Sequence, residues 1–219
     1  DIGVRLFHWL LVASFIIAYA SSEEESLVHI YSGYLVLALI SFRLLWGIIG
    51  SKYARFSNFL YSPGKVVSYL KSLISRNPEH YLGHNPAGGF MVIILLISLF
   101  IVTISGLKLY AIEEGKGPLA AQINISIVST AHADDDRYEH DNDDDDHHEY
   151  RRYGLYKDVY ESGKYKSEDE SEELWEEIHE ASTNFTVFLI LLHILGVFIA
   201  GKLHNDNLIM AMITGNKSL

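Results

Sequence analysis

Polar and apolar positions are segregated into long blocks along this chain. Four stretches carry almost no Asp, Glu, Lys or Arg, and each approaches or exceeds the roughly 20 residues that a helix needs to cross a bilayer. Backbone polar groups in lipid must be hydrogen-bonded within the segment, which a helix achieves. The stretches lack the polar stripe of soluble amphipathic helices. The pattern predicts an all-α membrane protein, a single domain over residues 1–219 with a four-helix bundle of spans at about 4–22, 26–50, 85–110 and 179–201.

Charge is concentrated between the third and fourth predicted spans. Residues 113–178, here called the acidic insertion, hold 21 of the 28 acidic residues and 7 of the 17 basic ones, a net charge of −14 in a chain of −11. Its stretch 134–148 contains eight aspartates and three histidines, ligand types that capture divalent cations. The alternative is a solvated and largely disordered insertion, which the composition favours.

The basic residues predict the orientation in the membrane. The connection 51–84 carries five basic residues and one acidic residue, and loops of this kind stay in the cytoplasm. Both termini are therefore expected in the cytoplasm, with the acidic insertion as a long extracytoplasmic loop between the third and fourth spans. The sequence has no cysteine, which excludes disulfides, thiolate zinc sites, iron–sulfur clusters and covalently attached haem.

Four histidines lie within or at the mouths of the predicted spans, where polar groups are costly and point to function. His8 lies in span one and His29 opens span two, whereas His179 and His193 belong to span four. Because successive spans alternate in direction, His8 and His193 share an inner level, and His29 and His179 share an outer level. The two histidines of span four are 14 residues apart, or about 21 Å along a helix. One such histidine is commonly a hydrogen-bonded interface residue, but pairs at matching depths indicate ligands.

Two neutral imidazoles in an apolar cavity favour one cofactor in particular. Zinc normally takes four protein ligands, or three and a water. Two axial nitrogens are sufficient when a macrocycle supplies the other four, so the pairs predict two non-covalent b-type haems. Gly33 and Gly196 lie one turn beyond His29 and His193 and would let a flat ring approach the backbone. Ordinary packing of small residues between helices is the alternative for both glycines.

Further polar residues could contact the two predicted haems or a quinone. Arg43, 14 residues after His29, would be level with the inner pair and could balance haem propionates, with snorkelling to the interface as the alternative. Lys108, at the outer end of span three, could do the same for the outer haem. Arg5 and His84 lie near the inner ends of the spans, where a quinone could bind. His84 could also contact a propionate or cap the turn before span three.

Taken in order, these motifs resemble those of the bacterial cytochrome b561 and nickel–iron hydrogenase b-type cytochrome family. The resemblance is carried by Arg-x-x-His-Trp at 5–9, His-x-x-x-Gly at 29–33, Arg-x-x-Trp at 43–46, Gly-His-Asn-Pro-Ala-Gly at 83–88 and the stretch 177–215. It covers nearly the whole chain except about residues 115–172.

The resemblance implies a four-helix membrane bundle in which two b haems take their axial ligands from His8, His29, His179 and His193. It also implies electron transfer between a quinone pool and a partner redox protein, by the cytochrome b subunit of a quinone-linked oxidoreductase complex in a bacterial inner membrane. We expect the partner to be an extracytoplasmic redox protein or enzyme subunit with a basic docking surface that faces the acidic insertion. The other contact is membrane lipid, and no nucleic acid partner is expected.

Three other functions stay open at this point. A His-lined transporter of metal ions or protons would gather cations with the acidic insertion, although transporters more often place Asp or Glu within their spans. A structural anchor for a peripheral enzyme would not need histidines paired by depth. Within the same family, an oxidase that passes electrons from superoxide to quinone is a further alternative.

Overall fold

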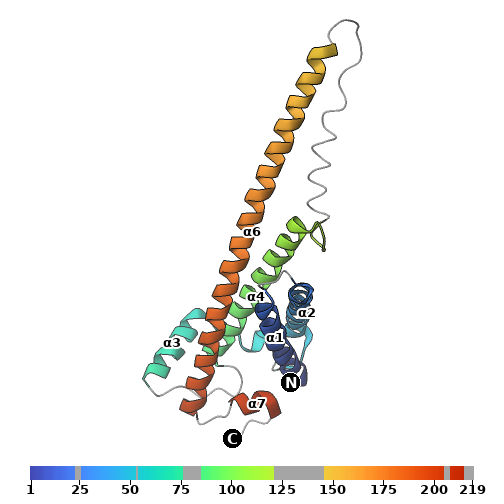
Figure 1. Cartoon of the computed structure of the whole chain (residues 1–219). Helices are drawn as coiled ribbons and strands as arrows, with labels where there is room; N and C mark the ends of the chain where they lie inside the picture. Colours follow the sequence, from blue (N-terminus) through green and yellow to red (C-terminus); the bar gives the residue numbers. More distant parts are fainter. Residues whose placement is uncertain (23–25, 53, 76–84, 121–145, 205–207, 215–219) are drawn as a thin grey trace. The chain divides into compact units, whose positions relative to one another are not determined.

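The computed structural model describes residues 1–22, 26–52, 54–75, 85–120, 146–204 and 208–214. These residues form helices and no strands, in the order α1 (Ile2–Ala20), α2 (Leu27–Ile49), the short 3-10 helix η1 (Phe56–Asn58), α3 (Pro63–Ile74), α4 (Pro86–Glu113), α6 (Asp146–His204) and α7 (Leu208–Thr214) (Figure 1).

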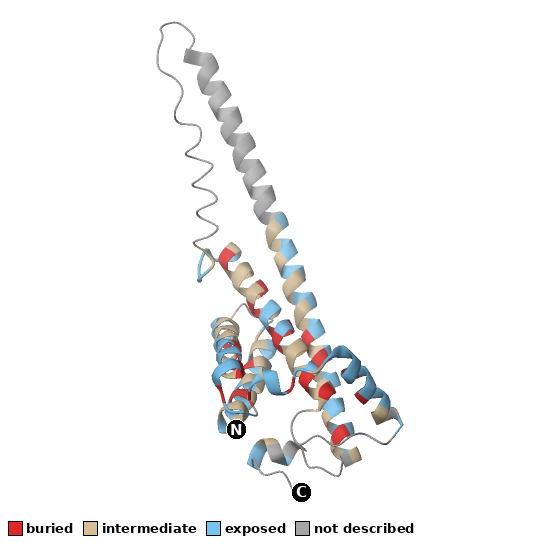
Figure 2. Cartoon of the chain, turned by 180° about the vertical axis from the view of Figure 1, so that it is seen from behind, coloured by how far each residue is buried: buried red, intermediate tan, exposed pale blue. Residues whose placement is uncertain are grey.

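Four helices are long and apolar enough to cross a membrane, which confirms the predicted spans. They are Ile2–Ala20, Leu27–Ile49, Pro86–Glu113 and Glu170–Leu203. Many large apolar side chains on these helices are exposed, and pale blue residues run along their surfaces in Figure 2. An apolar outer surface is expected of helices whose solvent is lipid. The fold is therefore that of a multi-pass membrane protein.

The ends of α1 and α2 are set by capping residues. Asp1 accepts a hydrogen bond from the backbone amide of Val4, and Ser26 accepts one from the amide of His29, each at 3.3 Å. Such caps satisfy amides that the first helical turn leaves without partners. The two helices lie side by side in Figure 1. The Ser26 cap thereby fixes His29 in the first turn of α2.

The chain forms two compact units. The first comprises residues 1–103 and 181–219, and the second comprises residues 104–180. In the first unit, Val36 and Ile40 of α2 pack with Leu99 of α4 in a buried core, with Leu11 and Phe15 of α1 against them. The hydroxyls of Ser98 and Thr186 are hydrogen-bonded, so a buried polar contact also joins α4 to α6 in this unit.

Helix α6 extends much further than the sequence indicated. A loop was predicted throughout residues 113–178, but the structure shows one helix from Asp146 to His204. The prediction of a loop is therefore wrong over residues 146–178. The segment contains no proline and is rich in Glu, Lys and Arg, which favour helix when solvated. Residues 121–145, which include most of the Asp-rich stretch, lie outside the described residues.

Candidate functional site

His8 and His193 are brought together within the first unit. His8 lies on α1 and His193 on α6, and the two imidazoles are within electrostatic range of each other. The Nδ1 atom of His8 is buried and has no hydrogen-bond partner among the described residues. The ring of Trp9 meets that of His8 edge to face, with 5.2 Å between centroids. Because a buried imidazole nitrogen without a partner is costly, His8 has unused capacity for a polar partner or a ligand.

His29 has a fixed proton position. Its Nδ1 atom lies 2.9 Å from the backbone carbonyl oxygen of Ala18 on α1. A carbonyl oxygen only accepts, so Nδ1 carries the proton and Nε2 of the neutral ring carries the lone pair. Histidines that bind metals typically donate their other ring N–H to a carbonyl or a similar acceptor in this way. The capped start of α2 thus presents a tautomer suited to metal ligation.

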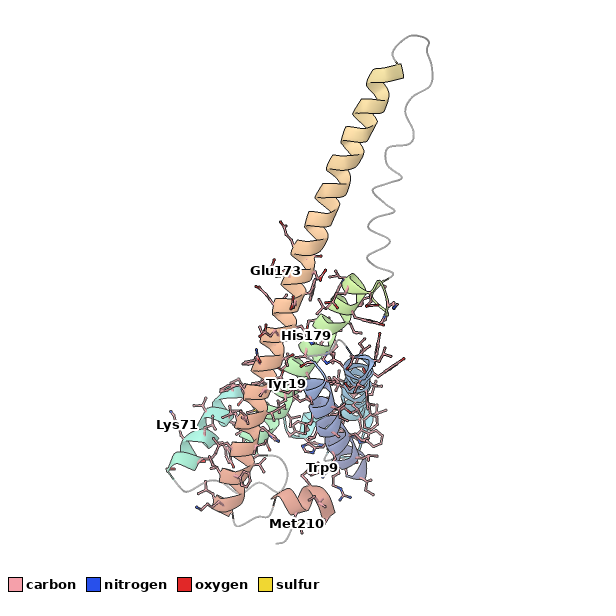
Figure 3. The ribbon with its side chains drawn as sticks, in the orientation of Figure 1. Trp9, Tyr19, Lys71, Glu173, His179 and Met210 are labelled. Atoms are coloured by element: carbon pink, nitrogen blue, oxygen red, sulfur yellow. The ribbon has the colours of Figure 1, made fainter. Side chains whose placement is uncertain are left out.

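His179 is held by two residues of α4 within the second unit. Its Nδ1 atom lies 3.1 Å from the hydroxyl oxygen of Ser105, a side chain that is 1% exposed. Gly106 leaves room for the ring, because a Cβ atom there would lie 2.9 Å from Cε1 of His179. Figure 3 labels His179 on α6. Neither α4 residue was predicted from the sequence, although a serine within an apolar span is a signal that points to Ser105.

The surroundings of Gly33 and Gly196 are open in the structure. A Cβ atom added at either glycine would meet no atom within 4 Å. Close packing between helices therefore does not explain why a glycine stands at these positions. Space of this kind, one turn from His29 and His193, suits a flat macrocycle against the backbone.

Arg43 has a structural role that the sequence did not reveal. It is 3% exposed, so it does not snorkel to the interface. Its Nη1 donates to the carbonyl oxygen of Ala54 at 3.1 Å, and its guanidinium lies 4.7 Å from the centroid of the Phe56 ring. A buried guanidinium over an aromatic face is favourable, so Arg43 fastens the segment after α2 to the helix end. Its predicted contact with haem propionates stays a prediction.

Arg5 is oriented by the C-terminal helix. Its Nη1 donates to the carbonyl oxygen of Ile213 in α7 at 2.8 Å, while its Nε is buried without a partner among the described residues. Trp9 donates from Nε1 to the carbonyl of Met212 at 3.4 Å, and Figure 3 shows Trp9 beside α7. The buried Nε–H of Arg5 therefore has no acceptor among the described residues and is available to a ligand, on the same face of α1 as His8.

Lys108 and His84 are less informative. Lys108 is half-buried near the end of α4 and has no hydrogen bond or ion pair within the described part of the chain. His84 lies outside the described residues. The predicted roles of both residues stay predictions.

The donor set fits haem better than a metal ion held by protein alone. Among the described residues, no three His, Asp or Glu side chains come together as a metal-binding cluster. A bare zinc ion needs at least three protein ligands, whereas a haem iron needs two axial nitrogens. Axial ligation of haem agrees with three observations. They are the pairing of His8 with His193, the Nδ1 contacts of His29 and His179, and the space beside the glycines.

The fold and these histidines define a multi-pass membrane protein with imidazoles on three of its spanning helices. The sequence profile of the prokaryotic cytochrome b561 family matches residues 1–215. The chain therefore belongs to the prokaryotic cytochrome b561 family, which confirms the predicted resemblance. The family implies electron transfer in the membrane on b-type haem. Neither a search of curated proteins nor a search of solved structures gave a match.

Proposed function

We propose that this cytochrome transfers electrons across the bacterial inner membrane between the quinone pool and a redox protein on the outer face, through two bis-histidine b haems. The observation that carries the proposal is the juxtaposition of His8 and His193, which come from different spans and leave the buried Nδ1 of His8 without a partner. In a family that transfers electrons on b-type haem, such a pair is suited to the two axial positions of one iron.

The second pair is His29 with His179. Its assignment rests on depth, because His179 is 14 residues before His193 on α6, or about 21 Å along the helix. Each of the two rings is held at Nδ1, by the Ala18 carbonyl and the Ser105 hydroxyl respectively. When bound, b haems at these two levels supply reversible one-electron chemistry at both sides of the membrane.

Further residues would make room for the haems, orient their ligands and bind a quinone or a propionate. Gly33 and Gly196 leave room beside the ligands, and Ser105 keeps the His179 ring from rotating. Arg5, held by α7, presents its free Nε at the end of α1 that the orientation rule assigns to the cytoplasm. A buried donor of this kind favours binding of a quinone carbonyl or a propionate near the inner level.

The outer partner is assigned by charge. The acidic insertion has a net charge of −14 and precedes the outer mouth of the fourth span in the proposed orientation. A partner with a basic surface would be steered to it, and the association would weaken as salt screens the charges. This protein would thus be the membrane subunit of a quinone-linked oxidoreductase complex.

Haem stoichiometry tests the proposal. The purified chain should contain two haems by the pyridine haemochrome assay, both low-spin in their absorption spectra. Acid–acetone should extract all of the haem, because no cysteine is available for covalent attachment. One haem per chain, or none, would contradict the proposed electron path.

A further inference from the structure

Helix α3 has an apolar side that no part of the described structure covers. Its polar residues Lys65, Ser68, Lys71 and Ser72 share one face by helical spacing. Val66 and Tyr69 of the same helix are buried, and burial raises the pKa of the Tyr69 phenol. Next to them, Val67 is 51% exposed and Leu70 is 46% exposed. The helix therefore packs with one part of its apolar surface and leaves an adjoining stripe open.

The segment before α3 is fixed to the ends of two membrane spans. Arg55 donates from Nε to the carbonyl oxygen of Gly50, the C-cap residue of α2, at 2.8 Å. The Phe56 ring fills the space beside Gly47 on α2. Phe59, which is 2% exposed, packs against Gly89 in the first turn of α4. These contacts hold the segment at the level where both spans leave the membrane.

Helix α3 must therefore begin close to the membrane surface. Pro63, the first residue of α3, lies only four positions after Phe59, and four residues span at most about 14 Å. The helix itself has 12 residues and a length of about 18 Å. A helix so tethered, with an open apolar stripe, has lipid within reach.

The charge of this region selects the kind of lipid. Residues 51–75 contain Lys52, Arg55, Lys65 and Lys71 and no Asp or Glu. Lys65 and Lys71 are exposed and flank the apolar surface of α3 from its polar face. Helices with basic residues beside an apolar stripe lie in the membrane interface and are attracted to anionic headgroups.

We propose that α3 is an interfacial helix that docks on anionic phospholipid, with Val67 and Leu70 at the acyl boundary and Lys65 and Lys71 on lipid phosphates. The proposal is independent of the electron path. Each lysine should strengthen the preference for anionic lipid about fivefold, the usual effect of one basic residue near such a surface. The interaction would hold the connection between α2 and α4 flat against the membrane.

Nitroxide labels test this directly, since the chain has no native cysteine to interfere. Val67→Cys places a label on the open stripe, and Ser68→Cys places the matched control on the polar face. The full chain is reconstituted in nanodiscs of phosphatidylcholine, with or without phosphatidylglycerol. We expect the label at 67 to be relaxed by oxygen and shielded from a water-soluble nickel chelate, with the reverse at 68. Phosphatidylglycerol should strengthen the difference.

The lysines supply the second arm. The double variant Lys65→Gln and Lys71→Gln should abolish the effect of phosphatidylglycerol on the label at 67, while Lys52→Gln should retain it. An equal loss with Lys52→Gln would overturn the assignment to α3. So would a label at 67 that is as accessible to nickel as the label at 68. Dipolar broadening between labels would show a second copy on the stripe, and shielding from both reagents would show protein contact; either result overturns lipid docking.

Discussion

Replacing Ser105 by alanine should loosen the outer haem without unfolding the bundle. The Ser105 hydroxyl lies 3.1 Å from Nδ1 of His179 and restrains the rotation of this ring. In the proposed site, His179 is an axial ligand. Removing the hydroxyl takes away a hydrogen bond that restrains the ring at Nδ1, so the effect should appear in cofactor affinity.

The size of the effect follows from the contact. A neutral hydrogen bond contributes about 1 kcal/mol net, which is about a fivefold change in an equilibrium constant. Ser105 is 1% exposed, so water cannot take the place of the hydroxyl. Partners that orient metal ligands commonly change affinity by about 10- to 100-fold when removed. We expect a loss of about five- to tenfold, at the lower end because the bond is neutral and single.

The assay is haem retention and redox titration of the purified variant in detergent. The matched control is Ser98→Ala, which removes another buried hydroxyl contact between α4 and α6, the one to Thr186, where no histidine is involved. Both variants should lose similar thermal stability, but only Ser105→Ala should lower occupancy of one haem. Equal haem content in the two variants would refute the orienting role of Ser105.

Gly106→Ala should displace the His179 ring by steric contact. Its new methyl group would stand 2.9 Å from Cε1 of His179, so the ring must move by roughly 0.6 Å to restore an ordinary contact of about 3.5 Å. This variant should therefore lose more of the outer haem than Ser105→Ala does. Retention of both haems with unchanged potentials would show that His179 is not held at its ligating geometry by α4.

Three further variants test other parts of the account. The methyl group of Gly33→Ala would meet no protein atom within 4 Å, so the variant should stabilise the haem-free helix by up to about 1 kcal/mol, yet lower haem occupancy in the spectrum. Gly64→Ala, at an equally open position in α3, should leave haem occupancy unchanged. Arg43→Gln should lower the unfolding temperature by an amount equivalent to about 1–3 kcal/mol, because the buried carbonyl of Ala54 loses its hydrogen-bond donor. A shifted haem potential at unchanged stability would instead favour the role of Arg43 beside the propionates. Deleting residues 134–148 should weaken binding to a basic redox partner in a salt-dependent pull-down while both haems remain, and loss of haem would make the stretch part of the fold.

The spans were predictable because lipid imposes one simple condition on them. A run of about 20 uncharged residues has few alternatives to a membrane helix, so the four spans follow from composition alone. The histidines could be singled out for the same reason, since each is a polar exception in such a run. The partners of their rings could not, because Ser105 and His179 are separated by 74 positions and meet only through packing.

Two features show where pattern alone is insufficient. The acidic insertion looked like a loop because its composition is that of a disordered segment, but high helix propensity and the adjoining span allow α6 to start at Asp146. By its position on the helix, Arg43 looked like a partner of haem propionates or a snorkelling side chain. Its actual partners, Ala54 and Phe56, lie in a segment whose path along the membrane surface the sequence does not specify.

The pairing of the four histidines tests the central claim most directly. Alanine is placed at His8, His29, His179 and His193 one at a time, and each variant is titrated by redox potentiometry to find which of two haem transitions is lost. The account predicts two classes, with His8 and His193 removing one transition and His29 and His179 removing the other. Two ligands of one iron must meet at one depth, and about 21 Å separates the levels along α6. If His8 instead grouped with His29 or with His179, both the pairing and the alternation of the spans would be contradicted.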